Sequence, residues 1–538
     1  MQKEWIPRVE GIDFPAILEA RGIDDKDIPM FVDPENFANE VPPRKFAHLE
    51  RAVSRVSNRL LEGGSILVVA DVDADGVTSG AIIYNALWNC LPSKCTLEIV
   101  VGSGKQHGIT QHLDYILDSR FDMVIACDSG SDEHETYDIL LQHDIEVIIL
   151  DHHGTSNPDS NTITVNPEIW PVPKSQLSGA GMCLKFAEIL EESRDIGYMP
   201  YDLATVGIIA DMMDMRYEDN RAICAKGFAD LRNQGIKAAL QGYEFNATSI
   251  RFSIAPLVNA AQRMGKNNLA LELFLDTTSP ERCKQIVDEL KELKGEQKAL
   301  IAEALSNIDI YDRGKYIVAT IDRNDEIAGL SGLIANKIAA EEQKPTIFLQ
   351  YNQNEEQWQG SIRSYGVSNF KSIINETEWA IAEGHEEAAG IRLKSELSDL
   401  MDALDDEMPD EQRQVIEVDA EIDFVSDLTL ADVAFMDRIN KVTGEGFEPI
   451  TVMISGVVPD SIFAMGKKHT KIVCGDVTLL LWNDTSPVDE WRYNKWKSFD
   501  IIGEPTISRY RGKEEINVII NDIEYELEVI VSNEPHDD

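Results

Sequence analysis

The sequence is poor in cysteine and has no long apolar run. Its 538 residues include seven cysteines, which lie singly among apolar neighbours with no Cys-x-x-Cys pair. That spacing argues against a disulfide scaffold or a thiolate metal site and favours reduced thiols in a cytoplasm. No stretch of 18 apolar residues is present, and no charged-then-apolar leader follows Met1. We therefore expect a cytoplasmic protein with neither a membrane span nor a secretory signal.

Basic residues are also scarce. The chain has 49 Lys and Arg against 95 Asp and Glu, a net charge of −46. A nucleic-acid enzyme normally presents a basic surface, whereas this average charge repels phosphates. Either the basic residues are concentrated along a channel, or the substrate is small enough to need no long basic track. The acid-rich stretches at 401–411 and 534–538 are most simply solvated surface or linker.

Carboxylates follow the first strongly apolar stretch of the chain. Residues 65–70 (S-I-L-V-V-A) have strand character and lead directly into Asp71, Asp73 and Asp75, after which Gly76 allows a turn into a helical pattern. With 95 acidic residues, about three acidic-x-acidic-x-acidic strings are expected by chance. The motif alone is therefore weak evidence for a site.

The same arrangement recurs twice downstream. The apolar run at 122–127 ends in Asp128, and the run at 145–150 ends in Asp151-His152-His153. A further strand at 96–101 and helical stretches at 110–120 and 133–143 complete a β-α alternation, which predicts an α/β domain with a doubly wound parallel sheet. Because the carboxyl ends of parallel strands meet at one edge, we expect a site there for a hard divalent cation.

Short motifs along most of the chain occur in an order typical of one family. They are V-V-A-D-V-D-A-D-G-V-T-S (68–79), V-I-A-C-D-S-G (124–130), D-H-H (151–153), V-N-P (165–167), L-S-G-A-G (177–181), I-I-A-D (208–211), E-D-N-R (218–221), P-L-V-N-A-A-Q-R-M (256–264), G-L-S-G-L-I-A-N-K-I (329–338), G-S-I-R-S (360–364) and E-G-H-E-E-A-A-G (383–390). In order and spacing the chain resembles the DHH phosphoesterases, and within them the RecJ-like single-strand nucleases.

The resemblance and the local patterns together predict the domain organisation. We expect an N-terminal cap on the first domain (1–50), a DHH catalytic metal-binding domain (51–278), a connecting helix (279–312), a DHHA1-type second α/β domain that binds nucleic acid (313–405) and an oligonucleotide-binding (OB-fold) β-barrel (413–530). The helix has an N-cap candidate in Ser279 and apolar residues at intervals of three and four.

The resemblance implies a centre of two Mn²⁺ or Mg²⁺ ions. Asp128 would bridge the ions, Asp73 and Asp75 would each face a different ion, and His152 with Asp211 would complete one site. His153 would contact the scissile phosphate or protonate the leaving group, so His153 and Asp128 are the expected catalytic residues. Asp71 is a further metal residue, and Asp71 and Asp151 are expected to support the others. Val69 stands where many relatives have a ligating His.

A second set of residues is expected to hold the nucleic-acid end across from the metals. An Arg with a neighbouring hydroxyl suits a phosphate, because the guanidinium fork matches its oxygens. The set implied by the resemblance is Ser361, Arg363, Gly384, His385, Arg263 and Asn259. The chain departs from the family at Gln262, which replaces a usual Gly, at Ile327, which replaces a frequent His, and in 101–109, which keeps only His107 and Gly108 of the family pattern.

The C-terminal region contains short strand patterns suited to a Greek-key barrel. Aromatic and basic residues alternate at 491–497 and 509–513. Stacking faces beside cations suit single-stranded nucleic acid. The alternative is that these aromatics belong to the barrel core and the lysines are simply solvated.

These features predict a monomeric, metal-dependent exonuclease that degrades single-stranded DNA from 5′ to 3′ in recombination, repair or replication. Single-strand-binding protein or other replication and repair proteins are candidate partners. One alternative is a phosphodiesterase for oligoribonucleotides or cyclic dinucleotides, which would not need the barrel expected over 413–530. The other is a non-catalytic scaffold, which is disfavoured because every metal position keeps a side chain able to bind an ion.

Overall fold

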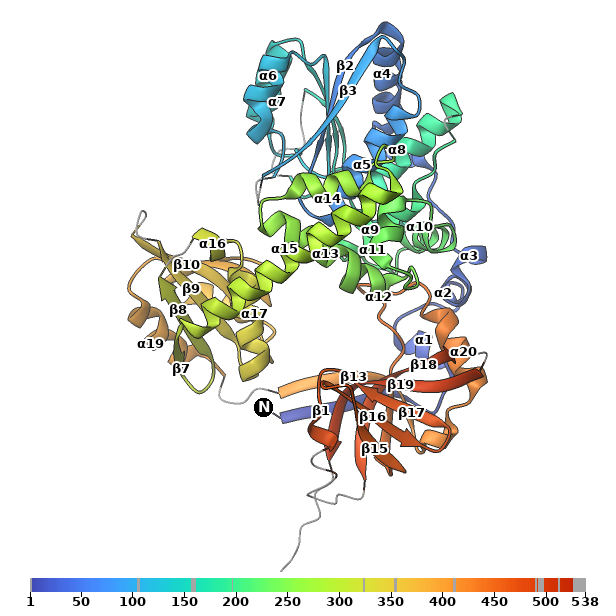
Figure 1. Cartoon of the computed structure of the whole chain (residues 1–538), viewed down its shortest axis with the longest axis vertical. Helices are drawn as coiled ribbons and strands as arrows, with labels where there is room; N and C mark the ends of the chain where they lie inside the picture. The colour runs from blue at the N-terminus through green and yellow to red at the C-terminus, as the bar shows by residue number, and fades with distance from the viewer. Residues whose placement is uncertain are drawn as a thin grey trace, which may run out of the picture. The chain divides into compact units, whose positions relative to one another are not determined.

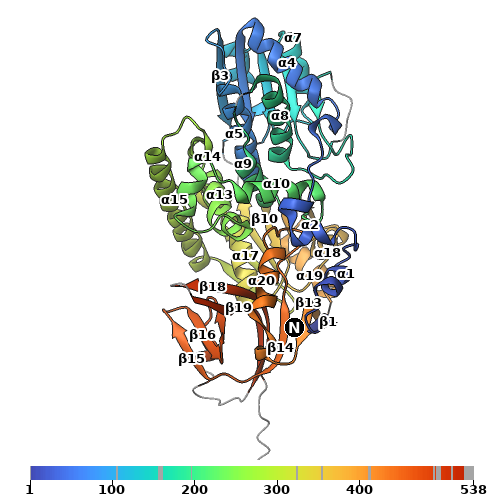
Figure 2. The ribbon, with the colours of Figure 1, turned by 90° about the vertical axis from the view of Figure 1, so that its right-hand side faces the viewer.

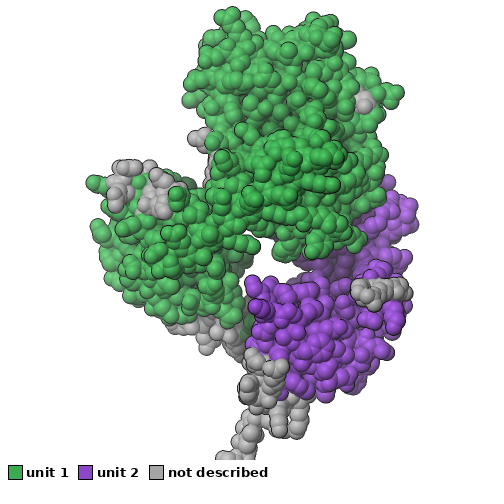
Figure 3. All heavy atoms as spheres, viewed as in Figure 1, with its two compact units in different colours: residues 1–3, 40–213, 226–414 green, residues 4–39, 214–225, 415–538 purple. Residues whose placement is uncertain are grey.

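The computed structural model describes residues 2–103, 107–155, 161–195, 197–322, 325–352, 356–409, 413–488, 491, 498–510 and 513–525. The chain forms two compact units, coloured separately in Figure 3. Unit 1 comprises Met1–Lys3, Glu40–Met213 and Lys226–Gln414, and unit 2 comprises Glu4–Asn39, Asp214–Ala225 and Val415–Asp538. Most of the aromatic and basic runs predicted at 491–497 and 509–513, and the acidic tail, lie outside the described residues.

Unit 1 begins with the predicted parallel sheet, whose strand order is β3-β2-β4-β5-β6. The strands are β2 (Gly64–Ala70), β3 (Cys95–Val101), β4 (Met123–Cys127), β5 (Glu146–Leu150) and β6 (Ile163–Val165). Helices cover both faces of the sheet (Figure 1). One face carries α6 (Leu113–Ser119) and α7 (His134–Gln142), and the other carries α4 (Leu49–Glu62), α5 (Ala74–Trp88) and α8 (Gly179–Arg194). Because both faces are covered, the central strands are continuous apolar runs.

Helices follow the sheet. They are α9 (Tyr201–Ala210), α10 (Glu218–Ala229), α11 (Gln234–Leu240), α13 (Ala255–Arg263), α14 (Asn267–Phe274) and α15 (Pro280–Ser306), with short helical turns η1 (Pro43–Lys45), η2 (Thr110–His112), α12 (Ala247–Ser249) and the π-helical η3 (Ile250–Ile254). The turned view of Figure 2 shows α15 beside α13 and α14. No helix in the described part of the chain is both long and apolar enough to span a membrane.

The long helix α15 is the predicted connecting helix. The side chain of Ser279 accepts a hydrogen bond from the backbone N–H of Arg282 at 3.2 Å, so the predicted N-cap is confirmed. The first half of α15 buries Cys283, Ile286 and Leu290 and contacts α11, α13 and α14. Its second half contributes Ile301 and Ala304 to the core of the next sheet.

The second sheet of unit 1 is mixed, with strand order β11-β12-β10-β9-β8-β7. Its strands are β7 (Asp309–Asp312), β8 (Ile317–Asp322), β9 (Thr346–Asn352), β10 (Gln357–Arg363), β11 (Ala380–Gly384) and β12 (Ala388–Leu393). One apolar core joins the sheet to α16 (Asp325–Ala328) and α17 (Ser331–Glu342). Another joins it to α18 (Phe370–Glu376) and α19 (Leu397–Glu407). The predicted second α/β domain is therefore present.

Unit 2 contains an eight-stranded mixed sheet with the order β1-β13-β14-β18-β19-β17-β16-β15. Its strands are β1 (Gln2–Glu10), β13 (Arg413–Ile422), β14 (Val452–Val457), β15 (Ser461–Met465), β16 (His469–Cys474), β17 (Val477–Leu481), β18 (Phe499–Tyr510) and β19 (Lys513–Tyr525). Its helices are α1 (Phe14–Ala20), α2 (Ile28–Val32), α3 (Pro34–Phe37), η4 (Val425–Asp427) and α20 (Leu430–Ile439).

The N-terminal segment departs from the expectation that 1–50 caps the first domain. Strand β1 is instead an edge strand beside β13, and Glu4–Asn39 groups with unit 2. An ion pair strengthens this association, because the Arg21 guanidinium donates to both oxygens of the Asp419 carboxylate, at 2.6 and 2.5 Å. The segment could not be assigned from its own sequence, since its pairing partner, β13, begins only at Arg413.

Candidate metal centre

The end of β2 and the start of α5 supply three carboxylates. Asp71 follows the strand directly, and Asp73 is the N-cap of α5, where its side chain accepts a hydrogen bond from the Gly76 N–H at 2.9 Å. Asp75 lies in the first turn of the same helix. The positive end of a helix dipole favours carboxylates at these positions. Helix capping and the helix dipole thus hold Asp73 and Asp75 at the carboxyl edge of the sheet, and Asp71 lies directly after β2 at the same edge.

A second helix fixes the Asp75 carboxylate. Asp75 accepts hydrogen bonds from Ser178 Oγ at 2.8 Å, from the Gly179 N–H at 2.8 Å and from the Ala180 N–H at 3.1 Å, all at the N-terminus of α8. Helix α9 also lies against the Asp75 carboxylate, since a Cβ added at Gly207 would be 2.2 Å from Asp75 Oδ1. The carboxylate is therefore oriented by backbone groups rather than by a basic side chain.

Asp128 and His152 lie at the centre of the site. Asp128 follows β4 with a left-handed φ of 64°, a conformation that Asp and Asn tolerate better than most residues. His152 Nε2 lies 3.2 Å from Asp128 Oδ1, 3.4 Å from Asp211 Oδ2 and 3.9 Å from Asp75 Oδ2. Both His152 Nε2 and Asp128 Oδ1 are buried without a hydrogen bond. Such groups are expected where an ion completes the site.

Three overlapping groups could each hold an ion. They are Asp71 with Asp73 and Asp128, Asp75 with His152 and Asp211, and Asp128 with His152 and His153, and within each group the ligand atoms lie within 4.8 Å of one another. All six predicted metal residues thus converge, although three come from the β2–α5 junction and the others from β4, β5 and α9. Asp128 and His152 each belong to two groups, which suits a pair of ions.

Electrostatics indicate that this cluster needs cations. Burial, reinforced by neighbouring carboxylates, raises the pKa of Asp73 to about 6 and that of Asp211 to about 8. The same causes raise the pKa of Asp128 well above its ordinary value. Carboxyl groups this close cannot all ionise without a counter-charge. Oxygen and imidazole donors without thiolate fit Mn²⁺ or Mg²⁺.

His153 differs from His152 because it has a carboxylate partner. Its Nδ1 is hydrogen-bonded to Asp151 Oδ1 at 2.8 Å, and this bond raises the pKa of His153 to about 9. Burial alone would raise the pKa of Asp151, but the hydrogen bonds and charge of His153 outweigh burial and hold it at about 2. The His153 ring is 56% exposed, so its Nε2 is available as a proton donor. Asp151 therefore orients His153, as expected.

His107 is a residue of the site that was not predicted to act there. Its Nδ1 is hydrogen-bonded to Asp71 Oδ2 at 2.7 Å, and this bond raises the pKa of His107. Val69, by contrast, is fully buried in the core between the sheet and α6 and α7, so no ligand comes from that position. The only signal for His107 in the sequence was that the His107-Gly108 pair is kept in a segment that otherwise departs from the family pattern.

A basic cavity of about 380 Å³ is lined by three of the six predicted nucleic-acid residues, Arg263, Ser361 and Arg363. The side chain of Ser331, at the N-terminus of α17, is hydrogen-bonded to Ser361 at 2.9 Å between the two hydroxyl oxygens. Burial lowers the pKa of both arginines, and the charge of Arg363 further lowers that of Arg263. Two close guanidinium groups and a helix N-terminus favour an anion such as phosphate.

The other three predicted residues lie outside that lining. Asn259 is half-buried on α13, one helical turn before Arg263. Gly384 ends β11 with a φ of 135°, and the exposed His385 follows in a turn closed by a hydrogen bond from its N–H to the Ala388 carbonyl at 3.1 Å. Gly384 and His385 thus shape the loop rather than line the cavity. Ser331, which also lines the cavity, was not among the predicted residues, although it belongs to the motif at 329–338.

Comparisons with known proteins place the metal centre within a known family domain. A model of the DHH family, N-terminal domain, matches residues 65–236, and a model of the RecJ OB domain matches residues 418–522. YorK of Bacillus subtilis (strain 168), named as an inferred SPbeta prophage-derived single-strand DNA-specific exonuclease, is 26% identical over 96% of this chain and 96% of its own. The single-stranded-DNA-specific exonuclease RecJ of the same organism is 24% identical over 94% of this chain and 67% of its own.

The fold is also known from a solved structure. The crystal structure of RecJ in complex with Mn²⁺ from Thermus thermophilus covers 97% of this chain and 80% of its own, with a TM-score of 0.76 and 20% sequence identity. This similarity confirms the predicted combination of a DHH domain, a long connecting helix, a second α/β domain and an OB domain.

Proposed function

Since the chain is RecJ-like, with a DHH-family domain followed by a RecJ OB domain, we propose that it is a metal-dependent exonuclease that hydrolyses phosphodiester bonds of single-stranded DNA. The observation that carries the proposal is the convergence of Asp71, Asp73, Asp75, Asp128, His152 and Asp211 at one sheet edge. The names of the relatives, which are described as single-stranded-DNA-specific exonucleases, supply the substrate.

The proposed resident ions are two Mn²⁺ or Mg²⁺, held by those six residues, with Asp128 shared. When bound, such ions act as Lewis acids on phosphoryl oxygens and supply a strong nucleophile near neutral pH. Asp75 is held in position by the N-terminus of α8, and Asp71 by His107. These contacts keep the donor set assembled before an ion arrives.

His153 acts on the reacting phosphate in this proposal. With a pKa of about 9, its imidazole is protonated at neutral pH, and its bond to Asp151 leaves the Nε2 proton free to be donated. That proton can stabilise a phosphate oxygen or be transferred to the departing sugar oxygen. His153 is thus the proposed general acid.

Arg263, Ser361 and Arg363 form the proposed phosphate clamp, which would hold the 5′ end and thereby set the direction of degradation as 5′ to 3′. We also retain the domain limits 51–278, 279–312, 313–405 and 413–530 as part of the proposal. The pathway would be recombination, repair or replication.

The test is hydrolysis of 5′-labelled DNA and RNA strands by the purified chain, with Mn²⁺, with Mg²⁺ and with EDTA. We expect the release of mononucleotides from the 5′ end of single-stranded DNA, strictly dependent on metal. Cleavage confined to di- and trinucleotides or cyclic dinucleotides would favour the small-substrate phosphodiesterase. No cleavage of any substrate with either metal would favour the scaffold.

A further inference from the structure

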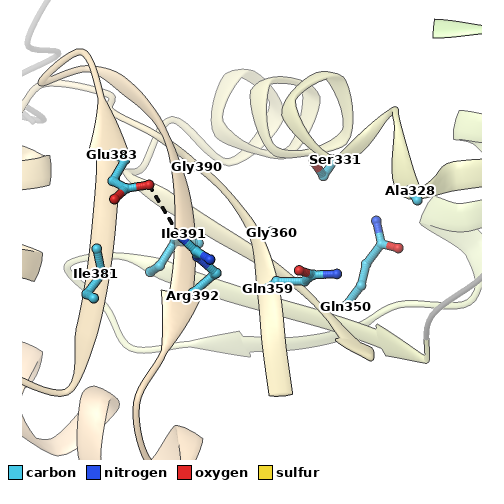
Figure 4. A pocket seen from close by; sticks show the side chains of 10 residues that line it. All are labelled: Ala328, Ser331, Gln350, Gln359, Gly360, Ile381, Glu383, Gly390, Ile391 and Arg392. Atoms are coloured by element: carbon cyan, nitrogen blue, oxygen red, sulfur yellow. Dashed lines mark hydrogen bonds and ion pairs between the residues drawn. The ribbon is translucent and has the colours of Figure 1, made fainter. Parts of the chain in front are cut away.

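Several basic side chains of the second α/β domain are already balanced by acids. In the cavity of about 510 Å³ shown in Figure 4, Arg392 is paired with Glu383 at 3.3 Å. Lys371 of the same domain is paired with Glu386 at 3.1 Å. A surface that attracts a long nucleic-acid strand needs cations that are not balanced in this way.

Helix α15 carries four lysines on one side. Lys284, Lys291 and Lys298 are seven residues apart, which is close to two full helical turns, so their side chains project in nearly the same direction. Lys294 lies three residues after Lys291 and four before Lys298, the spacings at which helical residues are neighbours. The first three are exposed and Lys294 is half-buried. We call these four residues the lysine stripe, which runs along about 21 Å of the helix.

No member of the lysine stripe forms an ion pair within the part of the chain that the structure describes. Glu281 and Asp288 lie about one helical turn from Lys284 but do not pair with it. Ion pairing does occur elsewhere on the helix, since Arg282 Nη1 lies 2.6 Å from Glu289 Oε1. The stripe therefore presents positive charge that the protein leaves unbalanced.

Two members of the stripe also repel each other. Lys294 and Lys298 are four residues apart, and burial together with the charge of Lys298 lowers the pKa of Lys294. Like charges at this spacing destabilise a helix. A chain with 95 acidic and 49 basic residues nevertheless keeps them unbalanced. A negatively charged ligand would account for a repulsion that the protein itself does not relieve.

Gly295 lies on the same side of α15, four residues after Lys291 and three before Lys298. Glycine inside a helix costs stability relative to alanine. The φ of Gly295 is not positive, and a Cβ built there would meet no atom within 4 Å. Neither the backbone nor protein packing therefore requires glycine. The missing side chain lets the backbone of a ligand approach the helix between two lysines.

The stripe suits a sugar-phosphate backbone better than a protein surface. None of the exposed large apolar side chains in the described part of the chain lies on α15. Protein–protein interfaces depend on aromatic and apolar anchors and are depleted in lysine, whereas lysines supply phosphate contacts to nucleic acids. Helix α15 also packs against α13, which carries Arg263 of the phosphate clamp. The stripe thus lies on an element that adjoins the clamp within unit 1.

We propose that the lysine stripe binds the phosphates of a single nucleic-acid strand beyond the nucleotide held by the clamp, without reading its bases. The inference rests on the proposed function for the identity of the ligand. The stripe supplies the basic track that an acid-rich chain needs to hold a long strand, and Gly295 leaves room for the strand's backbone.

The first experiment measures strand binding without turnover. Fluorescence anisotropy in EDTA gives the Kd of a twenty-nucleotide oligothymidylate over a range of salt concentrations. Each phosphate contact to a single strand contributes about 0.7 to the steepness of log affinity against log salt. Lys284→Gln/Lys291→Gln/Lys298→Gln should therefore reduce the slope by about 2 and weaken binding about 100-fold at about 0.1 M salt. A tetranucleotide should lose much less affinity, because it covers less of the stripe.

Two matched variants separate position from charge. Lys45→Gln/Lys94→Gln/Lys394→Gln removes the same charge from exposed lysines outside the stripe and should change the slope little. The triple Lys→Arg variant of the same stripe positions keeps the charge and should retain the wild-type slope. Thermal unfolding checks that each variant folds. If the slope falls no further in the stripe variant than in the control, the proposal is overturned in favour of an acidic protein partner.

The second experiment tests the open position at Gly295. Gly295→Leu adds a side chain between two lysines without changing the charge, and leucine favours a helix. It should weaken binding of the long strand severalfold, whereas Gln285→Leu, at an exposed residue on another side of α15, should not. Equal binding by these two variants would overturn the approach of the strand at Gly295.

The two proposals fail in different ways. If the wild-type chain cleaves no strand with Mn²⁺ but the stripe variant loses salt dependence in EDTA, the proposed function falls and the stripe stands. If the chain cleaves DNA but the stripe variant binds strands as the control does, the stripe falls and the proposed function stands.

Discussion

At the residue scale, the metal centre is defined by acids that lack basic partners. Asp73, Asp128 and Asp211 all have raised pKa values because they are buried and lie near other carboxylates. A structural network would normally include a Lys or Arg to balance such charge. Among the basic side chains that the structure describes, only histidines lie near these acids. Divalent ions are therefore the expected counter-charge.

Asp128→Asn tests the proposed bridging ligand. Asn tolerates the left-handed backbone at this position, whereas Ala would add strain unrelated to metal binding. We expect a loss of exonuclease rate well beyond the roughly 10- to 100-fold typical of outer-shell changes, since a ligand itself is removed. Circular dichroism should be unchanged. Asp118→Asn, at an exposed position on α6, serves as the matched control, and comparable loss there would undermine the assignment.

Ion-free protein should become less stable as the pH rises. Asp211 has a pKa of about 8 in the folded chain against an ordinary value of 3.8, so the folded state holds this proton more tightly. Its contribution to the free energy of unfolding is complete below about pH 4 and is lost as the pH rises towards 8. Thermal unfolding in EDTA should therefore show a lower midpoint at pH 8 than at pH 6, and Mn²⁺ should restore it. Asp211→Asn should flatten the dependence; an unchanged slope in that variant would contradict the shift.

At the element scale, the centre depends on how closely three helices approach one another. The N-terminus of α8 donates to Asp75, and α9 passes the same carboxylate at Gly207. A Cβ at Gly207 would also lie 2.4 Å from the Ala180 Cβ. The helices therefore pack through small residues, and a carbon added at Gly207 reaches the Asp75 carboxylate.

Replacing glycine by alanine in two different helices separates the effect of helix propensity from the effect of packing. Gly207→Ala should lower the free energy of unfolding by about 1–3 kcal/mol through overpacking and weaken Mn²⁺ binding by displacing Asp75. Gly295→Ala, inside α15 where no atom lies within 4 Å of the added carbon, should raise stability by about 0.5–1 kcal/mol. Denaturant unfolding and Mn²⁺ titration provide the two readouts. A stabilising Gly207→Ala would show that α9 can move away without cost.

At the scale of the whole molecule, unit 2 is assembled from three distant segments. Arg221 is fully buried and donates to the carbonyls of Met30, Phe31, Met215 and Val442. Its guanidinium also lies 4.1 Å from the ring centroid of Phe31 and 4.8 Å from that of Phe447. One side chain thus joins the N-terminal segment, the 214–225 segment and the barrel region. Deleting the barrel would leave the other two segments without their partner.

Arg221→Met should therefore destabilise unit 2 strongly. Methionine fills much of the volume but leaves several buried carbonyls without donors, each worth about 1–3 kcal/mol, so we expect a loss above about 3 kcal/mol. Arg232→Met, at an exposed arginine paired with Asp230, is the control and should change little. Hydrogen exchange would localise the effect to Glu4–Asn39 and the eight-stranded sheet. A loss no larger than that of the control would mean that the carbonyls find other donors.

The sequence by itself determined the features that depend on local patterns. Continuous apolar runs specified the strands of the parallel sheet, and Ser279 specified where α15 begins, because burial and capping act over a few residues. Because the carboxyl ends of parallel strands share one edge of the sheet, the sequence alone predicted that Asp71, Asp128 and His152 would lie close together. Asp211 was recognised only through its motif, since an acid ending a helix is common elsewhere.

The tertiary structure decided everything that depends on distant partners. The pairing of β1 with β13, the hydrogen bond of His107 to Asp71 and the four carbonyls around Arg221 join segments that carry no mutual signal in the sequence. These contacts form between residues far apart in the sequence, so they depend on how the chain folds in three dimensions. No local pattern in either segment specifies its partner.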